Sequence, residues 1–249
     1  MENIAKAVAE RLYLLGQENH MLKIALILSL TLTSFWFSSS ASADEVTPEA
    51  YKAALLELNR NPVTQNPDYS LGRQVVKRRL LDKNNRAIGK INDIILMPNG
   101  KFKSIEANIT TAGFREDVGF NVESYVTDPT DSSFTIAMDK TQINQNMAQL
   151  MADIETSSGP DAPLTLNSLR GANIVDPKGM AIAKIEDAVV IDKQGLVQAL
   201  LVRMSAGKNR GSVMAIPYEA AEVRGSGART DFVLREDQVM SVMSLSKPR

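Results

Sequence analysis

Two aspartates, Asp93 and Asp187, hold the same position in two similar stretches of this 249-residue chain. The first stretch reads AIGKINDIILMPNGKF (87–102) and the second AIAKIEDAVVIDKQGLV (181–197). Both run Ala-Ile-x-Lys-Ile-x-Asp and continue through apolar residues into a turn that contains glycine. Two carboxylates that converge in space can act as general acid and base or bind a hard cation. A pair of catalytic or metal-binding aspartates is therefore one interpretation of the repeat.

The other interpretation of the two aspartates is structural. Residues alternate between the two faces of a strand, so Asp93 should share a face with Ile91 and Ile95. Asp187 stands in the same relation to its apolar neighbours. A buried carboxylate needs hydrogen-bond donors, and backbone N–H groups at a bend or bulge would supply them. Because the aspartates belong to different halves of the chain, we favour this interpretation and predict neither catalytic residues nor a metal site.

Basic residues gather in two other places. The loop SAGKNRGS (205–212) lacks the G-x-x-x-x-G-K-[ST] order of a phosphate-binding loop. We expect an inter-strand loop from which Lys208 and Arg210 could contact an anionic partner or a lipid headgroup. The one basic run carries three charges, a modest electrostatic patch. We expect a solvated strand edge protected from pairing by its charges, or else a contact for a partner; the run consists of Lys77, Arg78 and Arg79.

The N-terminal residues have the layout of a secretory signal peptide. Lys23 forms a minimal positive region, Ile24 to Phe37 are apolar, and Ala41-Ser42-Ala43 matches an A-x-A cleavage signal. The apolar stretch is short for a membrane span, and an uncleaved inner-membrane anchor is the alternative. We expect Met21 to be the true start, cleavage to follow Ala43, and the mature protein to be periplasmic.

The composition excludes several kinds of site from the mature chain. The sequence has no cysteine, and its one histidine, His20, precedes the expected cleavage point. Disulfides, zinc, copper or haem sites with Cys or His ligands, and Ser-His-Asp or Cys-His catalysis are therefore excluded. A formal net charge of −1 predicts no nucleic-acid footprint. We expect no cofactor and no nucleic-acid partner.

Two similar halves must position these candidates. A spacing of 94 relates Asp82 to Asp176 and Asp93 to Asp187, and it becomes 95 after the glycine turn. The turns contain Gly100 and Gly195, because glycine accepts the positive φ angles of tight hairpins. Short strands at regular spacing favour tandem small β-barrels. The expected strands span 75–81, 88–97, 102–109, 120–126 and 133–137, then 169–175, 182–191, 197–204, 212–217 and 232–234.

Helical periodicity marks two further segments. In TPEAYKAALLELNR (47–60), Thr47 suits the N-cap and Pro48 the first turn. Residues 141–156 present a stripe that includes methionines, which would pack on a barrel or contact a partner. Segments rich in Asn, Pro, Gly and Ser predict linkers. The expected division is a leader at 1–43, a helix and linker at 44–72, a first barrel at 73–145, a helix and linker at 146–164, a second barrel at 165–245 and a tail at 246–249.

The repeated stretches resemble the PRC-barrel family, which includes the cytoplasmic domain of the photosynthetic reaction centre H subunit and the C-terminal domain of a ribosome maturation factor. The similar residues are DKNNRAIGKINDIIL (82–96) and DPKGMAIAKIEDAVV (176–190), each followed by a glycine hairpin and an apolar strand. MAIPYEAAEV (214–223), with Pro217 and Tyr218, is similar to the closing segment of the family. Two departures are Ala183 in place of the motif glycine, Gly89 in the first half, and FNVESYVTD (120–128) in place of the Pro-aromatic segment.

The resemblance implies a mainly β fold of two tandem, small, partly open β-barrels with a few short helices. It also implies docking or assembly without shared catalytic residues. We therefore expect a non-enzymatic periplasmic interaction or scaffold module, with a protein partner or self-association and with peripheral membrane contact as a further option. The alternatives are binding of a small apolar or anionic ligand in a barrel or an inter-barrel cleft and, third, a carboxylate-dependent hydrolase.

Overall fold

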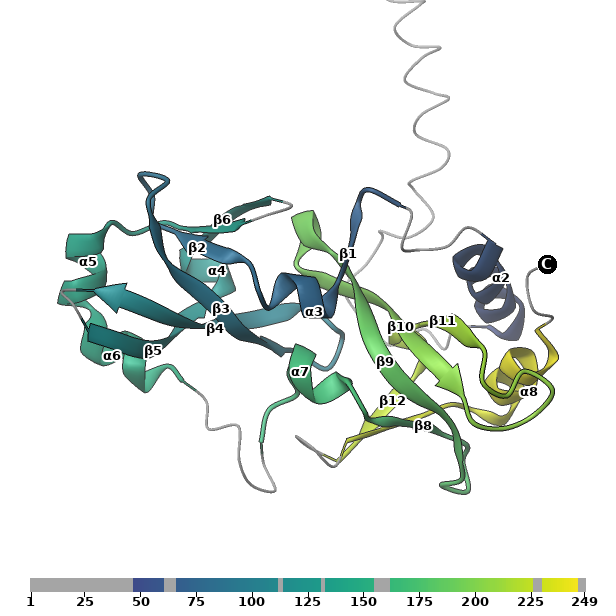
Figure 1. The fold of residues 1–249 in the computed structure, drawn as a ribbon. Coiled ribbons are helices and arrows are strands. Elements are labelled where there is room, and N and C mark those ends of the chain that lie inside the picture. The colour runs from purple at the N-terminus through teal and green to yellow at the C-terminus, as the bar shows by residue number, and fades with distance from the viewer. Residues whose placement is uncertain are drawn as a thin grey trace, which may run out of the picture. The chain divides into compact units, whose positions relative to one another are not determined.

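The computed structural model describes residues 47–60, 66–111, 114–130, 133–154, 162–225 and 230–245. The expected leader at 1–43 and the tail at 246–249 lie outside these residues. The chain is mainly β, with two sheets and several short helices (Figure 1), which confirms the fold class at this level. Strand pairing leaves both sheets with two free ends, so neither sheet is closed. No helix in the described ranges is long and apolar enough to cross a membrane.

The first sheet has the strand order β5-β4-β3-β2-β7-β6. Its centre is an antiparallel meander, and β2 pairs antiparallel with β3 on one side and parallel with β7 on the other. A short helix, α4 (Val122–Tyr125), joins the meander to the last strands. The strands are β2 (Arg79–Leu81), β3 (Ala87–Leu96), β4 (Phe102–Thr111), β5 (Phe114–Asn121), β6 (Val126–Thr130) and β7 (Ser133–Ile136).

The second sheet repeats this order as β11-β10-β9-β8-β13-β12, with an additional strand, β1, paired to β9. The central parallel pair has the same register in both sheets, Leu80 opposite Phe134 and Ile174 opposite Phe232. The repeat in the sequence is therefore a repeat of topology. The strands are β1 (Tyr69–Leu71), β8 (Asn173–Val175), β9 (Ala181–Ile191), β10 (Leu196–Met204), β11 (Val213–Pro217), β12 (Glu222–Arg224) and β13 (Asp231–Val233).

We call residues 69–154 the first copy and residues 163–245 the second copy. Their equivalent positions differ by 94 up to the glycine turn, as in the sequence repeat. One hydrophobic cluster contains buried side chains of both copies, and both belong to one compact unit, Val46–Arg249. The copies therefore share a core. Its largest fully buried side chains include Tyr51, Phe120, Phe134, Tyr218 and Phe232.

Three expected strands are partly wrong, and each error lies where a short helix precedes or follows a strand. Residues 75–81 divide into α3 (Gly72–Val75) and β2, and 169–175 divide into the end of α7 (Leu166–Leu169) and β8. Of the strand expected at 120–126, only residues 120–121 belong to β5, which begins at Phe114; residues 122–125 form α4, and Val126 begins β6. Local hydrogen bonds favour these helices: Gln74 Oε1 accepts the Leu71 N–H at 3.1 Å, and Thr165 Oγ1 accepts the Ser168 N–H at 3.1 Å. Such side-chain caps compete with extended backbone.

The expected N-terminal helix is confirmed as α2 (Pro48–Arg60), and Thr47 Oγ1 accepts the Ala50 N–H at 3.2 Å. The helix expected at 141–156 is instead two helices, α5 (Lys140–Gln145) and α6 (Met147–Ala152). Between them, Asn146 Nδ2 donates to the Gln142 carbonyl at 2.7 Å. Two short 3-10 turns, η2 (Asp192–Gln194) and η3 (Tyr218–Ala220), and a last helix, α8 (Glu236–Ser244), complete the described chain.

Each copy has one edge strand next to a helix. In the second copy, Asn59 of α2 binds the backbone of Ala215 on β11 twice, as donor to its carbonyl (2.7 Å) and acceptor from its N–H (2.9 Å). In the first copy, the backbone of Asp153, just after α6, lies against Gly119 on β5, where a Cβ would come 2.8 Å from the Asp153 oxygen. A covered edge resists pairing with other chains. Helix α2 thus precedes the first copy in the chain but covers the edge strand of the second copy.

Candidate functional site

Both repeated aspartates lie at β-bulges. The pairing register of β3 with β4 shifts between Ile91 and Asp93, and the register of β9 with β10 shifts at Asp187. A bulge adds one residue and reverses the alternation of faces beyond it. The main hydrophobic cluster accordingly contains Ile91 and Ile94, while Ile95, which is also buried, lies outside that cluster. The expected alternation through Asp93 is therefore wrong, and the bulge is the reason.

Each aspartate binds the backbone of a short helix in the opposite copy. Asp93 Oδ1 accepts the N–H of Asn167 in α7 at 3.1 Å, and Asp187 Oδ1 accepts the N–H of Arg73 in α3 at 3.2 Å. Arg73 and Asn167 are themselves equivalent positions, 94 residues apart. Each carboxylate also accepts the N–H of the residue that follows it, at 2.8 and 2.9 Å. The repeated carboxylate therefore joins the two copies in a reciprocal way.

The reciprocity extends along the interface between the copies. Leu71 of β1 pairs with Val189, and the equivalent residues Thr165 and Ile95 form an isolated bridge. The two glycine turns also exchange backbone hydrogen bonds, from Phe102 N–H to the Gly195 carbonyl (2.7 Å) and from Val197 N–H to the Gly100 carbonyl (2.9 Å). In a two-fold interface, residue i contacts j while its equivalent contacts the equivalent of j. The two copies thus form an approximate two-fold pair within one chain.

The remaining repeat residues lie at close backbone approaches. Gly100 has a φ of 82°, and a Cβ there would come 2.8 Å from two ring carbons of Tyr218 in the other copy. Gly195 has a φ of 56° and lies beside the Phe102 ring. A Cβ at Gly89 would overlap the Asn108 carbonyl oxygen of the neighbouring strand. Pro217, the last residue of β11, pairs with Ala199, and Tyr218 begins the 3-10 turn after it.

Gly100→Ala is expected to destabilise the chain more than Gly179→Ala. Both glycines have φ near +80°, but nothing lies within 4 Å of a Cβ at Gly179. Gly179→Ala, the control, should therefore lower the free energy of unfolding only by the cost of a left-handed alanine, about 1–2 kcal/mol. Gly100→Ala should lower the free energy of unfolding by about 1–3 kcal/mol more than the control does, because the buried Tyr218 ring must move. Urea unfolding of the two variants measures the difference, and equal midpoints would show that the Gly100–Tyr218 approach is unimportant.

Arg78 corrects the expectation for the basic run, because its side chain is inside the molecule. The residue is 7% exposed, and its Nη2 lies 2.8 Å from Asp192 Oδ2 of the second copy. The hydroxyl of Ser70 binds both groups. The guanidinium carbon also lies 5.8 Å from the centroid of the Phe134 ring, within cation–π range. Arg78 thus stabilises contact between the copies and is not available at the surface.

The buried cluster of Ser70, Arg78 and Asp192 has no polar equivalent on the other side of the approximate two-fold pair. By the repeat spacing, the positions of Ser70, Arg78 and Asp192 correspond to Leu164, Ala172 and Pro98. The corresponding position on the other side therefore has one small, one aliphatic and one cyclic apolar residue. The two sides of the interface differ in charge although their backbone contacts match.

The other basic candidates are exposed. Lys77 is on the surface, and so is Arg79, but Arg79 lies on β2, which has strands paired on both sides. The expected strand edge at the basic run is therefore wrong. Lys208 and Arg210 are exposed on a loop whose buried Asn209 donates from its side chain to the Leu245 carbonyl. The two charges remain surface candidates for a partner.

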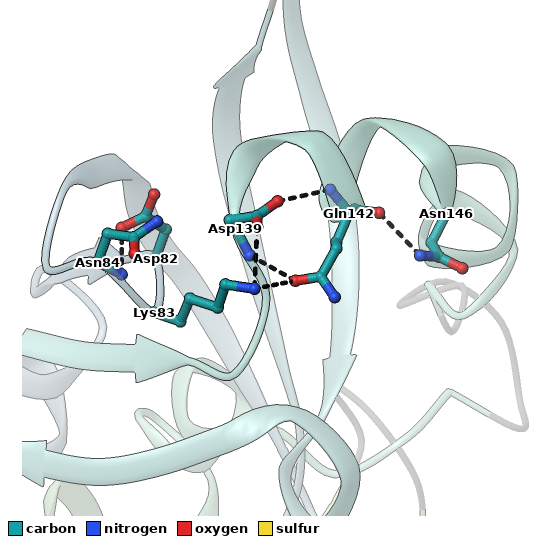
Figure 2. A network of polar contacts seen from close by, with 6 residues as sticks. All are labelled: Asp82, Lys83, Asn84, Asp139, Gln142 and Asn146. Carbon is teal, nitrogen blue, oxygen red and sulfur yellow. Dashed lines mark hydrogen bonds and ion pairs between the residues drawn. The ribbon is translucent and has the colours of Figure 1, made fainter.

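A polar network closes the junction between the 82–86 turn and α5 in the first copy (Figure 2). Lys83 Nζ lies 2.9 Å from Asp139 Oδ2 and donates to Gln142 Oε1 at 2.8 Å. Gln142 N–H donates to Asp139 Oδ1, and Asp139 N–H donates to Gln142 Oε1, which forms a capping box. The N–H of Gln142, and after it Lys83, lowers the pKa of the Asp139 carboxyl. Helix α5 is therefore capped and tied to the preceding turn.

The second copy has a pocket at the corresponding junction. Pro177 stands at the position of Lys83, and Arg235 takes the N-cap position of Asp139. The pocket has a volume of about 350 Å³, and its wall combines apolar residues, among them Ala221 and Val233, with two glutamates and two arginines. Gln238 Oε1 still accepts the Arg235 N–H at 2.8 Å, as Gln142 does for Asp139. The capping glutamine is thus common to the copies, while the residues around it differ.

These contacts limit what the repeated carboxylates can do chemically. Each Oδ1 atom already accepts two backbone N–H groups, and the Oδ2 of Asp187 lies 3.4 Å from the Arg73 guanidinium. Within the part of the chain that the structure describes, no three Asp, Glu, His or Cys side chains gather in a way that could hold a metal ion.

No model of a known protein family matches the sequence, and a comparison with curated proteins finds no significant match.

Proposed function

We propose that the chain is a non-enzymatic interaction or scaffold module that is exported to the periplasm. One observation carries the proposal: Asp93 and Asp187, the residues whose types and spacing best suit chemistry, bind helices of the opposite copy instead. A repeated carboxylate used in this way is an architectural element. It joins the two copies into one unit and leaves partner recognition to the surfaces on which the copies differ.

The topology supports a PRC-barrel-like interpretation of each copy. Both sheets are meanders completed by a parallel pair, and this pair has the same register in both (Figure 1 shows the strands). The glycine hairpin and the Pro217-Tyr218 segment, which carry the resemblance in the sequence, lie together at the interface between the copies. A partly open barrel of this kind fills its interior with side chains. Recognition would then occur on its outer surface.

Several large apolar side chains are available on that surface. Met180 and Met240 are each 63% exposed, and methionine packs adaptably against varied partners. Neither residue has an apolar equivalent at the same position in the first copy, where Arg86 matches Met180 and Asn144 matches Met240. These positions are therefore suitable places to look for a partner protein.

Crosslinking in cells tests the proposed function. A photo-crosslinking residue at Met180 or Met240 of the full chain should capture a discrete protein, whereas the same residue at exposed Lys193 should not. Mass spectrometry of the recovered chain should also find an N-terminus at Asp44 in the periplasmic fraction. The proposal would be overturned if the purified chain turned over a substrate and lost that activity on Asp93→Asn or Asp187→Asn while still folded.

A further inference from the structure

We propose that the pocket of the second copy binds an extended segment of a protein partner, through a methionine-sized apolar side chain that is followed by a carboxylate. This inference rests on the proposed function, because it names the partner segment that such a module would recognise. The first copy contains its own version of that segment. The second copy lacks the two residues that carry it, and its pocket lies beside the point where they are missing.

The first copy has two more residues at this junction. In the first copy, two residues stand between Ile136, at the end of β7, and the N-cap Asp139. In the second copy, the equivalent Leu234 is followed directly by the N-cap Arg235. The two additional residues of the first copy include Met138, which is 7% exposed. The Met138 carbonyl accepts the Lys83 N–H at 3.0 Å, so the segment is fixed to the turn. The second copy has no counterpart of this buried side chain.

The size of the pocket suits one side chain and a short piece of backbone. Its volume of about 350 Å³ is at the lower end of the range for ligand pockets, roughly 300–1,000 Å³. Pro177, Ala220, Ala221 and Val233 supply apolar surface without long side chains to fill the space. Pro177 has no N–H, so the hydrogen bond that Lys83 makes to the Met138 carbonyl has no counterpart there.

The wall carries two arginines, which can bind a carboxylate next to the apolar side chain, and two glutamates. Arg224 lies 3.1 Å from Glu222, and Arg235 lies 3.3 Å from Asp237, whose pKa its hydrogen bond lowers. A guanidinium has five N–H donors and can bind more than one carboxylate. Glu219 and Glu222 also line the pocket and would oppose a segment with several negative charges. One carboxylate beside an apolar residue fits this balance, as Asp139 follows Met138 in the first copy.

A peptide with the sequence Thr-Ile-Ala-Met-Asp-Lys-Thr, which is residues 135–141 of the first copy, is the probe. Fluorescence anisotropy of the labelled peptide with the purified chain should show saturable binding. Peptides with Met→Ala or Asp→Asn should bind at least about tenfold more weakly, a change that corresponds to 1.4 kcal/mol. No binding of the parent peptide, or equal binding of all three, would overturn the proposal.

Variants of the chain then locate the site. Ala221→Trp should fill the pocket and abolish binding, whereas Ala53→Trp on the exposed face of α2 should leave it unchanged. Arg224→Gln should weaken binding of the parent peptide but not of its Asp→Asn form. Retained binding in Ala221→Trp, or equal losses for both peptides in Arg224→Gln, would contradict the assignment. If crosslinking in cells still captured a partner when the peptide failed to bind, the proposed function would stand and the pocket assignment would fall.

Discussion

Arg78→Ala is expected to lower the free energy of unfolding by about 3–5 kcal/mol, the cost of leaving the buried Asp192 carboxylate without its cation. Both side chains are nearly inaccessible, at 6% and 7% exposure, and Nη2 lies 2.8 Å from Oδ2. Asp192→Ala should have a similar effect, because the guanidinium would then be unpaired beside Phe134. The loss should appear as a lower urea midpoint with an unchanged slope.

The double variant Arg78→Ala/Asp192→Ala should recover much of that loss. Neither charge would then be buried without its partner, and replacing a buried ion pair by apolar groups of similar volume is often neutral. The loss that remains should be that of the cavity left by the shorter side chains. The other side of the interface supports this expectation, since it has Ala172 and Pro98 at the equivalent positions. A double-mutant cycle gives the coupling between the two residues. Strictly additive losses would show that the pair does not act as a unit.

Asp187→Ala is expected to lower the free energy of unfolding by about 2–4 kcal/mol, which is more than the expected effect of Asp93→Ala. Asp187 is 2% exposed and accepts the N–H groups of Arg73 and Ala188, and each buried donor left unsatisfied costs about 1–3 kcal/mol. Asp93 makes equivalent bonds but is only half-buried, so water can replace part of what its carboxylate supplies. Thermal and urea unfolding of both variants measure the order.

Glu186→Ala is the matched control for Asp187→Ala. Glu186 is the preceding residue of β9, exposed, with a surface ion pair to Arg203 that should be worth less than about 1 kcal/mol. Asp187→Asn should lose less than Asp187→Ala, because the amide oxygen can still accept both N–H groups. Equal stability of Asp187→Ala and Glu186→Ala would contradict a role for the aspartate in joining the copies.

Local patterns in the sequence predicted the long elements well. The hairpins formed by β3 with β4 and by β9 with β10 follow clear runs of apolar residues that end in glycine turns, and α2 follows its cap and apolar stripe. The strands β1, β6 and β12, the helix α8 and residues 114–119 of β5 were not predicted. The three residues of β1 and of β12 are too few to show a period, and strands of that length form because a neighbouring strand is present to pair with them. The capping glutamines Gln142 and Gln238 were visible as a repeated residue, but their role was not.

The sequence by itself determined the two-copy organisation, the mainly β class and the recurrence of an aspartate at one position, because these depend on spacing along the chain. Only the tertiary structure decided what that aspartate does. A bulge turns Asp187 toward a helix whose contact residue lies 114 positions away, and Arg78 is buried because its partner Asp192, at the same separation, lies in the other copy. Whether a charged side chain is buried depends on such distant partners, which no local periodicity encodes.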